Sequence, residues 1–139
     1  IITGGKKMGG ELSEGAFLEP TLIAATNEVR IAQEEIFGPV ATVIKFKTEA
    51  EVIALANDSE YGLAGAVWTT NINRALRVAK AVKTGRMWVN CFNRLPAGAP
   101  FGGYKSSGIG RENHKMMLAA YTQVKNIYIS MREEREGMY

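Results

Sequence analysis

Between Ala41 and Asn90 the sequence alternates short apolar runs with helix-forming stretches, and this alternation constrains the fold most tightly. Residues 41–46, 63–68 and 87–90 are short and rich in β-branched or aromatic side chains, which favours buried strands. The two segments between them carry apolar residues at helical spacing. Strands joined by helices through short connections must run parallel with right-handed crossovers. The sequence therefore predicts an α/β fold built on a parallel β-α-β-α-β layer.

Local sequence marks where both helices begin and end. Thr48 and Glu51 have the spacing of a capping box, in which a hydroxyl and a carboxylate satisfy each other's backbone donors. Residues 57–58, Asn-Asp, close that first helix. Asn71 can cap the second helix, and Gly85 suits the left-handed position that follows a helix end.

The flanking regions are less regular. A strand is predicted over residues 16–23, and Pro20 within it restricts that strand to an edge or a short length. Residues 90–110 form a long Gly- and Pro-rich loop, a type of segment that is usually functional. A helix over 112–120 and a last strand over 124–130 are predicted next. Because that strand has no hairpin partner, we expect it to pair with a sheet of another subunit.

Bulk composition narrows the class of protein. The chain has 139 residues, 46% hydrophobic and 22% charged, which is typical of one globular domain. The net charge of +3 is spread among acidic residues without a basic patch, so nucleic-acid binding is disfavoured. No apolar run approaches the ~18 residues of a membrane span. The single cysteine, Cys91, suits a reducing compartment such as the cytoplasm.

Residues 34–37 offer a candidate nucleoside site. If this segment is extended, Glu35 and Phe37 point to the same side. The carboxylate could then accept hydrogen bonds from a ribose diol while the ring packs against a heterocycle. The alternative places Glu35 on a solvated face and Phe37 in the core, and residue chemistry alone favours that alternative.

Four stretches of sequence, in order along the chain, favour the nucleoside-site interpretation of Glu35 and Phe37 over the alternative. Residues 34–40 (EEIFGPV), 56–64 (ANDSEYGLA), 85–90 (GRMWVN) and 100–112 (PFGGYKSSGIGRE) closely resemble signature stretches of the aldehyde dehydrogenase superfamily. The resemblance covers nearly the whole chain and leans, in the region 110–117 and the tail, toward bacterial acetaldehyde-type enzymes.

The resemblance implies a domain organisation. Residues 1–120 correspond to the C-terminal part of the catalytic domain, and residues 121–139 to an oligomerisation strand and tail. The chain begins Ile1-Ile2 without an initiator Met, as a piece of a larger enzyme would, although removal of a tag or leader would leave the same start.

The resemblance also implies roles for individual residues. Glu35 matches the glutamate that binds the nicotinamide ribose, and Phe37 the phenylalanine that packs near the nicotinamide. Phe101 matches an aromatic that lines the aldehyde pocket, and Leu95 lies where a variable loop supplies a second wall. Glu112 matches a glutamate assigned to a proton path toward the general base; its structural alternative is a carboxylate at a helix start.

The lone thiol does not fit the role of nucleophile. Cys91 follows a strand end where family members often carry an unused cysteine, whereas the family nucleophile belongs to an upstream motif that is absent here. The sequence has only one cysteine and one histidine, His114, so no metal site is predicted.

The expected function follows from these matches. The parent enzyme oxidises an aldehyde to a carboxylic acid with NAD or NADP through a cysteine thioester, as a homodimer or homotetramer. This chain lacks the nucleophile, the base and the dinucleotide fold, so we expect it to be inactive without the upstream part of the enzyme. Gln123 departs from a glutamate found in some relatives, so an oligomer interface organised by that glutamate would have to rest on other residues here. The alternative is a non-enzymatic α/β binding or assembly module.

Overall fold

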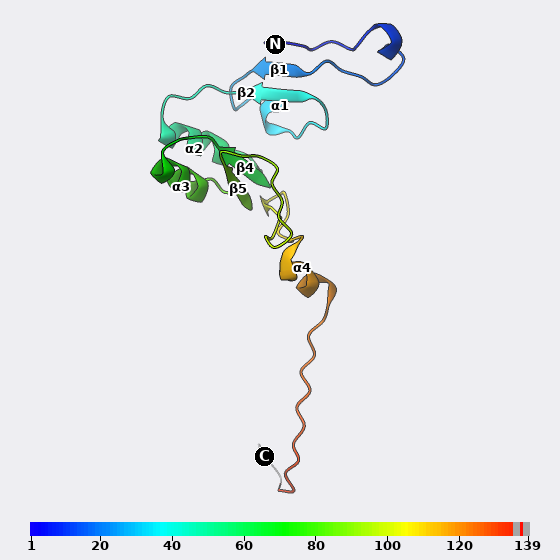
Figure 1. The fold of residues 1–139 in the computed structure, drawn as a ribbon, viewed down its shortest axis with the longest axis vertical. Coiled ribbons are helices and arrows are strands. Elements are labelled where there is room, and N and C mark those ends of the chain that lie inside the picture. Colours follow the sequence, from blue (N-terminus) through cyan, green and yellow to red (C-terminus); the bar gives the residue numbers. More distant parts are fainter. Residues whose placement is uncertain (135–136, 138–139) are drawn as a thin grey trace.

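The structure is a computed structural model that describes residues 1–134 and 137. Its elements follow one another along an elongated molecule, from an N-terminal arm, through the main α/β region, to an extended C-terminal tail (Figure 1). In chain order they are η1 (Gly10–Leu12), β1 (Thr21–Ala24), α1 (Arg30–Gln33), β2 (Val40–Val43), α2 (Glu49–Asn57), β3 (Tyr61–Gly62), β4 (Ala64–Val67), α3 (Ile72–Ala81), β5 (Arg86–Val89), β6 (Tyr104–Lys105) and α4 (His114–Tyr121).

The α/β class and its parallel strands are confirmed. β1 pairs with β2 in parallel, from Thr21 opposite Val40 onward, and β4 pairs with β5 in parallel, from Ala64 opposite Arg86 onward. The predicted layer is nevertheless divided, because β2 and β4 share no hydrogen bonds and the two pairs form separate sheets. The β-α-β-α-β order in sequence is therefore present without one continuous sheet.

Both helix starts are capped as predicted. The Thr48 hydroxyl accepts a bond from the Glu51 amide at 3.1 Å, and the Glu51 carboxylate accepts one from the Thr48 amide, which completes the capping box. Asn71 accepts a bond from the Arg74 amide at 3.0 Å at the start of α3. These caps form because their partners are three residues away and need no tertiary contact.

The interpretation of Gly85 as a left-handed helix terminator is wrong. α3 ends at Ala81, its C-cap residue Val82 is extended, and Gly85 is not among the residues with positive φ. A Cβ atom at Gly85 would instead collide with the carbonyl group of Gly102. Tertiary packing against the glycine-rich loop, rather than the helix end, therefore requires this glycine.

The N-terminal strand is shorter than predicted and starts after Pro20. Thr21 is buried, and its hydroxyl accepts a bond from the Gly5 amide and donates one to the Glu19 carbonyl, at 2.8 and 2.7 Å. Proline cannot donate to a ladder, so pairing begins at the next residue. Isolated bridges attach the N-terminal arm to β1 and to the residues before it: Thr3 pairs with Leu22 of β1, and Lys7 pairs with Leu18.

The C-terminal third departs most from expectation. The long loop contains β6, which pairs antiparallel with β3, a contact that the sequence did not predict. α4 begins at His114 rather than 112, and residues 124–130 are exposed and form no strand in the structure. In Figure 1 this tail runs away from the other elements.

No helix in the described residues is long and apolar enough to cross a membrane.

The chain buries little apolar surface on its own. Ala75 and Val78 of α3 and Trp88 of β5 are the buried hydrophobic residues of the described part. The accessible surface is 11473 Å², whereas a folded monomer of this mass would expose about 7,100 Å². Several faces that carry large apolar side chains are therefore uncovered.

Candidate functional site

The segment that contains Glu35 leaves a short helix in an extended conformation. The Glu34 amide closes α1 on the Arg30 carbonyl at 2.9 Å, and Glu34 itself has φ −89° and ψ 142°. Pro39 two residues beyond Phe37 excludes a continuing helix. Glu35 is exposed and the Phe37 ring is 92% exposed. The alternative that places Phe37 in the core is wrong for this structure.

Glu35 lines a cavity of about 560 Å³ together with the glycine-rich loop. Its wall includes Gln33 and Glu34 from the end of α1, Ser106 and Ser107 from the loop, and the residues around Tyr61 that follow α2. Phe37 does not line it. The structure thus brings Glu35 and two serines of the glycine-rich loop to one concave surface, although they lie far apart in sequence. Leu95, Phe101 and Glu112 do not line this cavity.

Phe101 and Glu112 are paired directly through their backbones. The Phe101 amide donates to the Glu112 carbonyl at 2.9 Å, and the Glu112 amide donates to the Phe101 carbonyl at 2.7 Å. Arg111 adds bonds from Nη1 to the carbonyl groups of Gly103, Ile109 and Gly110. The glycine-rich loop is therefore closed at its ends and braced inside. Glu112 precedes α4 by two residues, so it is not a first-turn carboxylate of that helix.

Leu95 is fixed through its neighbour. Trp88 Nε1 and Arg86 Nη2 both donate to the Arg94 carbonyl, at 2.9 and 2.7 Å. The Trp88 ring also lies 5.1 Å from the ring of Phe92, at an interplanar angle of 58°. Leu95 itself is 44% exposed. These roles of Arg86 and Trp88 could not be predicted from the sequence, because their partner is a backbone carbonyl and leaves no sequence pattern.

Cys91 follows β5 and is partly buried. Asn90 just before it has φ 53° and exchanges two side-chain bonds with the Thr69 backbone, at 2.8 and 3.0 Å. This pairing fixes the strand end that carries the thiol.

Within the described residues no group of three or more His, Cys, Asp or Glu side chains is arranged to hold a metal ion.

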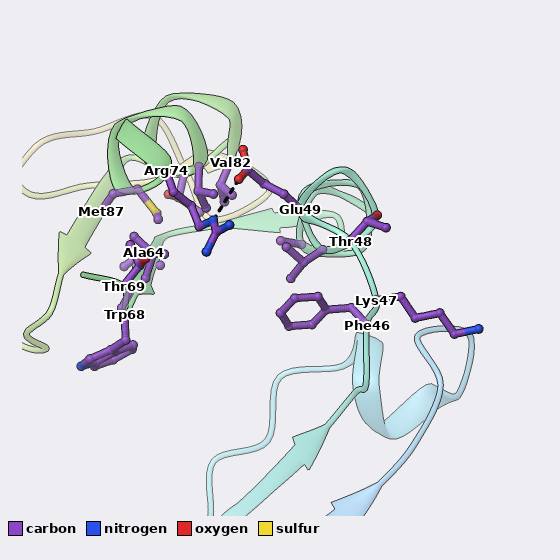
Figure 2. A pocket seen from close by; sticks show the side chains of 17 residues that line it. Phe46, Lys47, Thr48, Glu49, Ala64, Trp68, Thr69, Arg74, Val82 and Met87 are labelled. Carbon is purple, nitrogen blue, oxygen red and sulfur yellow. Dashed lines mark hydrogen bonds and ion pairs between the residues drawn. The ribbon is translucent and has the colours of Figure 1, made fainter. Parts of the chain in front are cut away.

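A second cavity of about 610 Å³ lies between α2, α3 and β4 and contains none of the predicted site residues (Figure 2). Figure 2 shows Glu49 of α2 and Arg74 of α3 reaching toward each other across it, at 3.2 Å. Arg77 also binds Glu49, at 2.8 Å. The hydrogen bond from Arg77, then its charge and that of Arg74, lower the pKa of the Glu49 carboxyl, and the pKa of Arg77 is raised in turn.

The chain was compared with known protein families and structures. The model of the aldehyde dehydrogenase family matches residues 1–127. A curated aldehyde dehydrogenase of Paracoccus denitrificans (strain Pd 1222) is 50% identical over the whole chain. The chain spans 28% of that relative's length.

Solved structures give the same match. A betaine aldehyde dehydrogenase of Staphylococcus aureus in complex with NAD⁺ is 46% identical, with a TM-score of 0.91 over 100% of this chain and 29% of its own. PnpE from Pseudomonas sp. WBC-3 is 37% identical, with a TM-score of 0.91 over 98% of this chain and 28% of its own. The resemblance inferred from the four sequence stretches is therefore confirmed.

Proposed function

The chain belongs to the aldehyde dehydrogenase family, and we propose that the protein containing it is an oxidoreductase that converts an aldehyde to a carboxylic acid with NAD or NADP. The observation that supports this most is the shared cavity, on which an exposed carboxylate, Glu35, and the glycine-rich loop meet. A substrate and a cofactor must be adjacent for hydride transfer, and the loop that meets Glu35 at this cavity is the loop that carries Phe101.

The residues present fit a nicotinamide nucleotide. The Glu35 carboxylate is exposed and can accept hydrogen bonds from both hydroxyl groups of a ribose. Phe37 presents an almost fully exposed ring on the same extended segment, available to pack against the nicotinamide. When bound, the nucleotide accepts the hydride. NAD⁺ is present in the structure of the Staphylococcus aureus relative, and we extend that cofactor to this protein.

The reaction requires groups from outside this chain. A cysteine thiolate upstream adds to the aldehyde carbonyl, the resulting oxyanion expels hydride to form a thioester, and water hydrolyses the thioester to the carboxylic acid and free thiolate. Phe101 and Leu95 would line the aldehyde pocket, and Glu112 would pass the proton released by the attacking water toward the general base. Cys91 takes no part, because the family nucleophile belongs to an upstream motif that this chain does not contain.

The assembly is part of the same proposal. Residues 1–120 complete the catalytic domain, and residues 121–139 extend to a neighbouring subunit of a cytoplasmic homodimer or homotetramer. The exposure of the apolar residues in 124–130, including 99% for Val124 and 73% for Ile129, supports a partner for this segment. Alone, the chain is inactive.

A chimera tests the activity. The matched part of the Staphylococcus aureus enzyme is replaced by this chain, and NADH formation is followed with betaine aldehyde and a series of other aldehydes. We expect aldehyde-dependent NADH from the chimera and none from the 139-residue chain alone. A chimera that folds and binds NAD⁺ but turns over no aldehyde would overturn the enzymatic proposal and favour a binding or assembly module. Turnover by the chain alone would overturn its predicted inactivity.

A further inference from the structure

Three separate parts of the chain meet at residues 57–59, which we call the helix-end turn because they form the C-terminal end of α2. The carbonyl groups at a helix end have no partner inside the helix and must find one elsewhere. Here the donors to these carbonyl groups come from α1 and the residues before it and from the glycine-rich loop. The end of α3 binds the Asn57 side chain instead.

The first contact comes from the segment that leads to Glu35. Gln33, the last residue of α1, donates from Nε2 to the carbonyl groups of Asp58 and Asn27, at 3.0 and 2.7 Å. Asn27 is buried, with 7% of its surface exposed, and donates to the carbonyl and carboxylate oxygens of Asp58 at 3.0 and 2.9 Å. The start of the Glu35 segment is therefore bound to the helix-end turn by the last residue of α1 and by Asn27, which lies three residues before α1.

The second contact comes from the glycine-rich loop. Lys105 donates from Nζ to the carbonyl groups of Asn57 and Ser59, at 2.9 and 2.8 Å. Its backbone has φ 54°, a left-handed conformation that is unfavourable for a lysine and persists only where the surroundings enforce it. An ammonium group at a helix C-terminus is also favoured by the helix dipole. The loop is held further by a bond from the Ser106 amide to the Glu60 carbonyl at 3.0 Å.

The third contact fixes the turn itself. The Asn57 side chain donates to the Ala81 carbonyl at 2.9 Å and accepts from the Lys83 amide at 2.7 Å. Asn57 thereby ties the turn to the end of α3, the helix that carries most of the buried core. The turn is a rigid reference point, because its side chain, its carbonyl groups and its carboxylate are all bound.

From this arrangement we propose that the helix-end turn positions both halves of the site, with Gln33 as the positioning residue for the Glu35 segment and Lys105 as the positioning residue for the substrate loop. The kinetic effects expected below rest on the proposed function. Neither side chain contacts the substrate or the cofactor; each holds a segment that is proposed to contact one of them. Displacements of about 1 Å in such segments can cost on the order of 100-fold in rate.

The two residues should affect different kinetic constants. Gln33→Leu removes two hydrogen bonds at the start of the Glu35 segment, so we expect the KM for NAD⁺ to rise roughly fivefold while the KM for aldehyde is unchanged. Lys105→Met removes the charged donor from the loop, so we expect kcat/KM for aldehyde to fall about tenfold with the KM for NAD⁺ unchanged. Asn57→Ala loosens the turn and should move both constants.

These variants are made in the chimera described above. Arg30→Gln serves as the control within α1, because it breaks only the exposed Arg30–Glu34 pair. Lys45→Met serves as the control for loss of an exposed lysine. Lys105→Arg keeps the charge and should restore part of the lost kcat/KM. The control variants should change neither constant by more than twofold. The proposal is overturned if Gln33→Leu and Lys105→Met also leave both constants within twofold of the parent.

A readout independent of turnover separates this proposal from the proposed function. Amide hydrogen exchange is measured over residues 34–38 and 103–108 in the same chimeras. We expect Gln33→Leu to accelerate exchange in the first segment alone and Lys105→Met in the second alone. If the exchange rates change in this way but the chimera oxidises no aldehyde, the positioning role is supported and the proposed enzymatic function is rejected. If exchange is unchanged but the chimera is active, the positioning role is rejected and the proposed enzymatic function is supported.

Discussion

Phe101 and Glu112 exchange both of their backbone hydrogen bonds, so the two ends of the glycine-rich loop are joined side by side. One of these residues is assigned to the aldehyde pocket and the other to a proton path. Their pairing places the two proposed roles on residues whose backbones lie directly opposite each other. Gly102 inside the loop leaves no room for a Cβ atom against the Gly110 carbonyl, which keeps the loop compact.

Removal of the Glu35 charge should weaken cofactor binding. In the chimera, Glu35→Gln replaces a charged acceptor by a neutral amide, and we expect the KM for NAD⁺ to rise about tenfold or more. Glu11→Gln is the matched control, because Glu11 is exposed and does not line the cavity that Glu35 lines. Steady-state kinetics at saturating aldehyde provide the measurement. Equal effects of the two substitutions would show that Glu35 holds no ribose.

Gly85→Ala should destabilise the junction between β5 and the glycine-rich loop. The added methyl group collides with the Gly102 carbonyl, a backbone atom that can move only with its loop. Overpacking of this kind costs about 1–3 kcal/mol. Gly98→Ala is the control, because a Cβ atom there meets nothing within 4 Å. Thermal unfolding of the two chimeras should separate them by several degrees, and coincident transitions would contradict the structural role of Gly85.

Local sequence determined part of the fold well. The caps at Thr48 and Asn71 were predictable because each depends on a partner three residues along the chain. The same local reasoning failed at Gly85, where the glycine follows a helix but serves a contact with Gly102. Local pattern also gave no sign of the β3–β6 pair, since that pairing joins short segments separated by a long loop.

The candidate site was predictable to a similar extent. Glu34, which follows α1, is extended, and the shared cavity brings Glu35 to the glycine-rich loop. An extended backbone over residues 35–37 stays a prediction. The common direction of the Glu35 and Phe37 side chains stays a prediction. Lys105 escaped notice because its acceptors are main-chain carbonyl groups, which any sequence would supply.

Trp88→Phe should loosen the segment that carries Leu95. The substitution removes the Nε1 donor to the Arg94 carbonyl and leaves Arg86 as the remaining donor. We expect a loss of about 1–2 kcal/mol in unfolding free energy and a higher KM for aldehyde in the chimera. Trp68→Phe is the control, because Trp68 is 63% exposed and the Arg94 carbonyl accepts from Trp88 instead. The prediction fails if both variants unfold together and share the parental KM.

The Glu49 cluster should make stability depend on pH. Because the pKa of Glu49 is lowered in the folded state, chiefly by the Arg77 hydrogen bond, its stabilising contribution is present above the ordinary carboxyl pKa. That contribution is lost as the pH falls through the folded pKa, where the carboxyl is protonated whether the chain is folded or not. The effect should be small and weaken with salt, because both arginine side chains are more than half exposed.

The measurement is the midpoint of urea unfolding for the chimera and its Glu49→Gln variant, from neutral pH down to about pH 3. The parent should be more stable at neutral pH, and the difference should vanish at the acidic end. Glu60→Gln, which alters a carboxylate without a recorded partner, should track the parent throughout. A constant gap across the range would mean that the Glu49 charge is not its source.

The scarcity of buried apolar side chains sets a limit on how this segment can persist. A chain whose hydrophobic interior rests on Ala75, Val78 and Trp88 has little reserve against unfolding or aggregation when its open faces meet water. Its sequence can therefore drift, be recombined or be grafted into another scaffold only in step with the surfaces that cover it. We therefore expect this segment and the surfaces that cover it to evolve together.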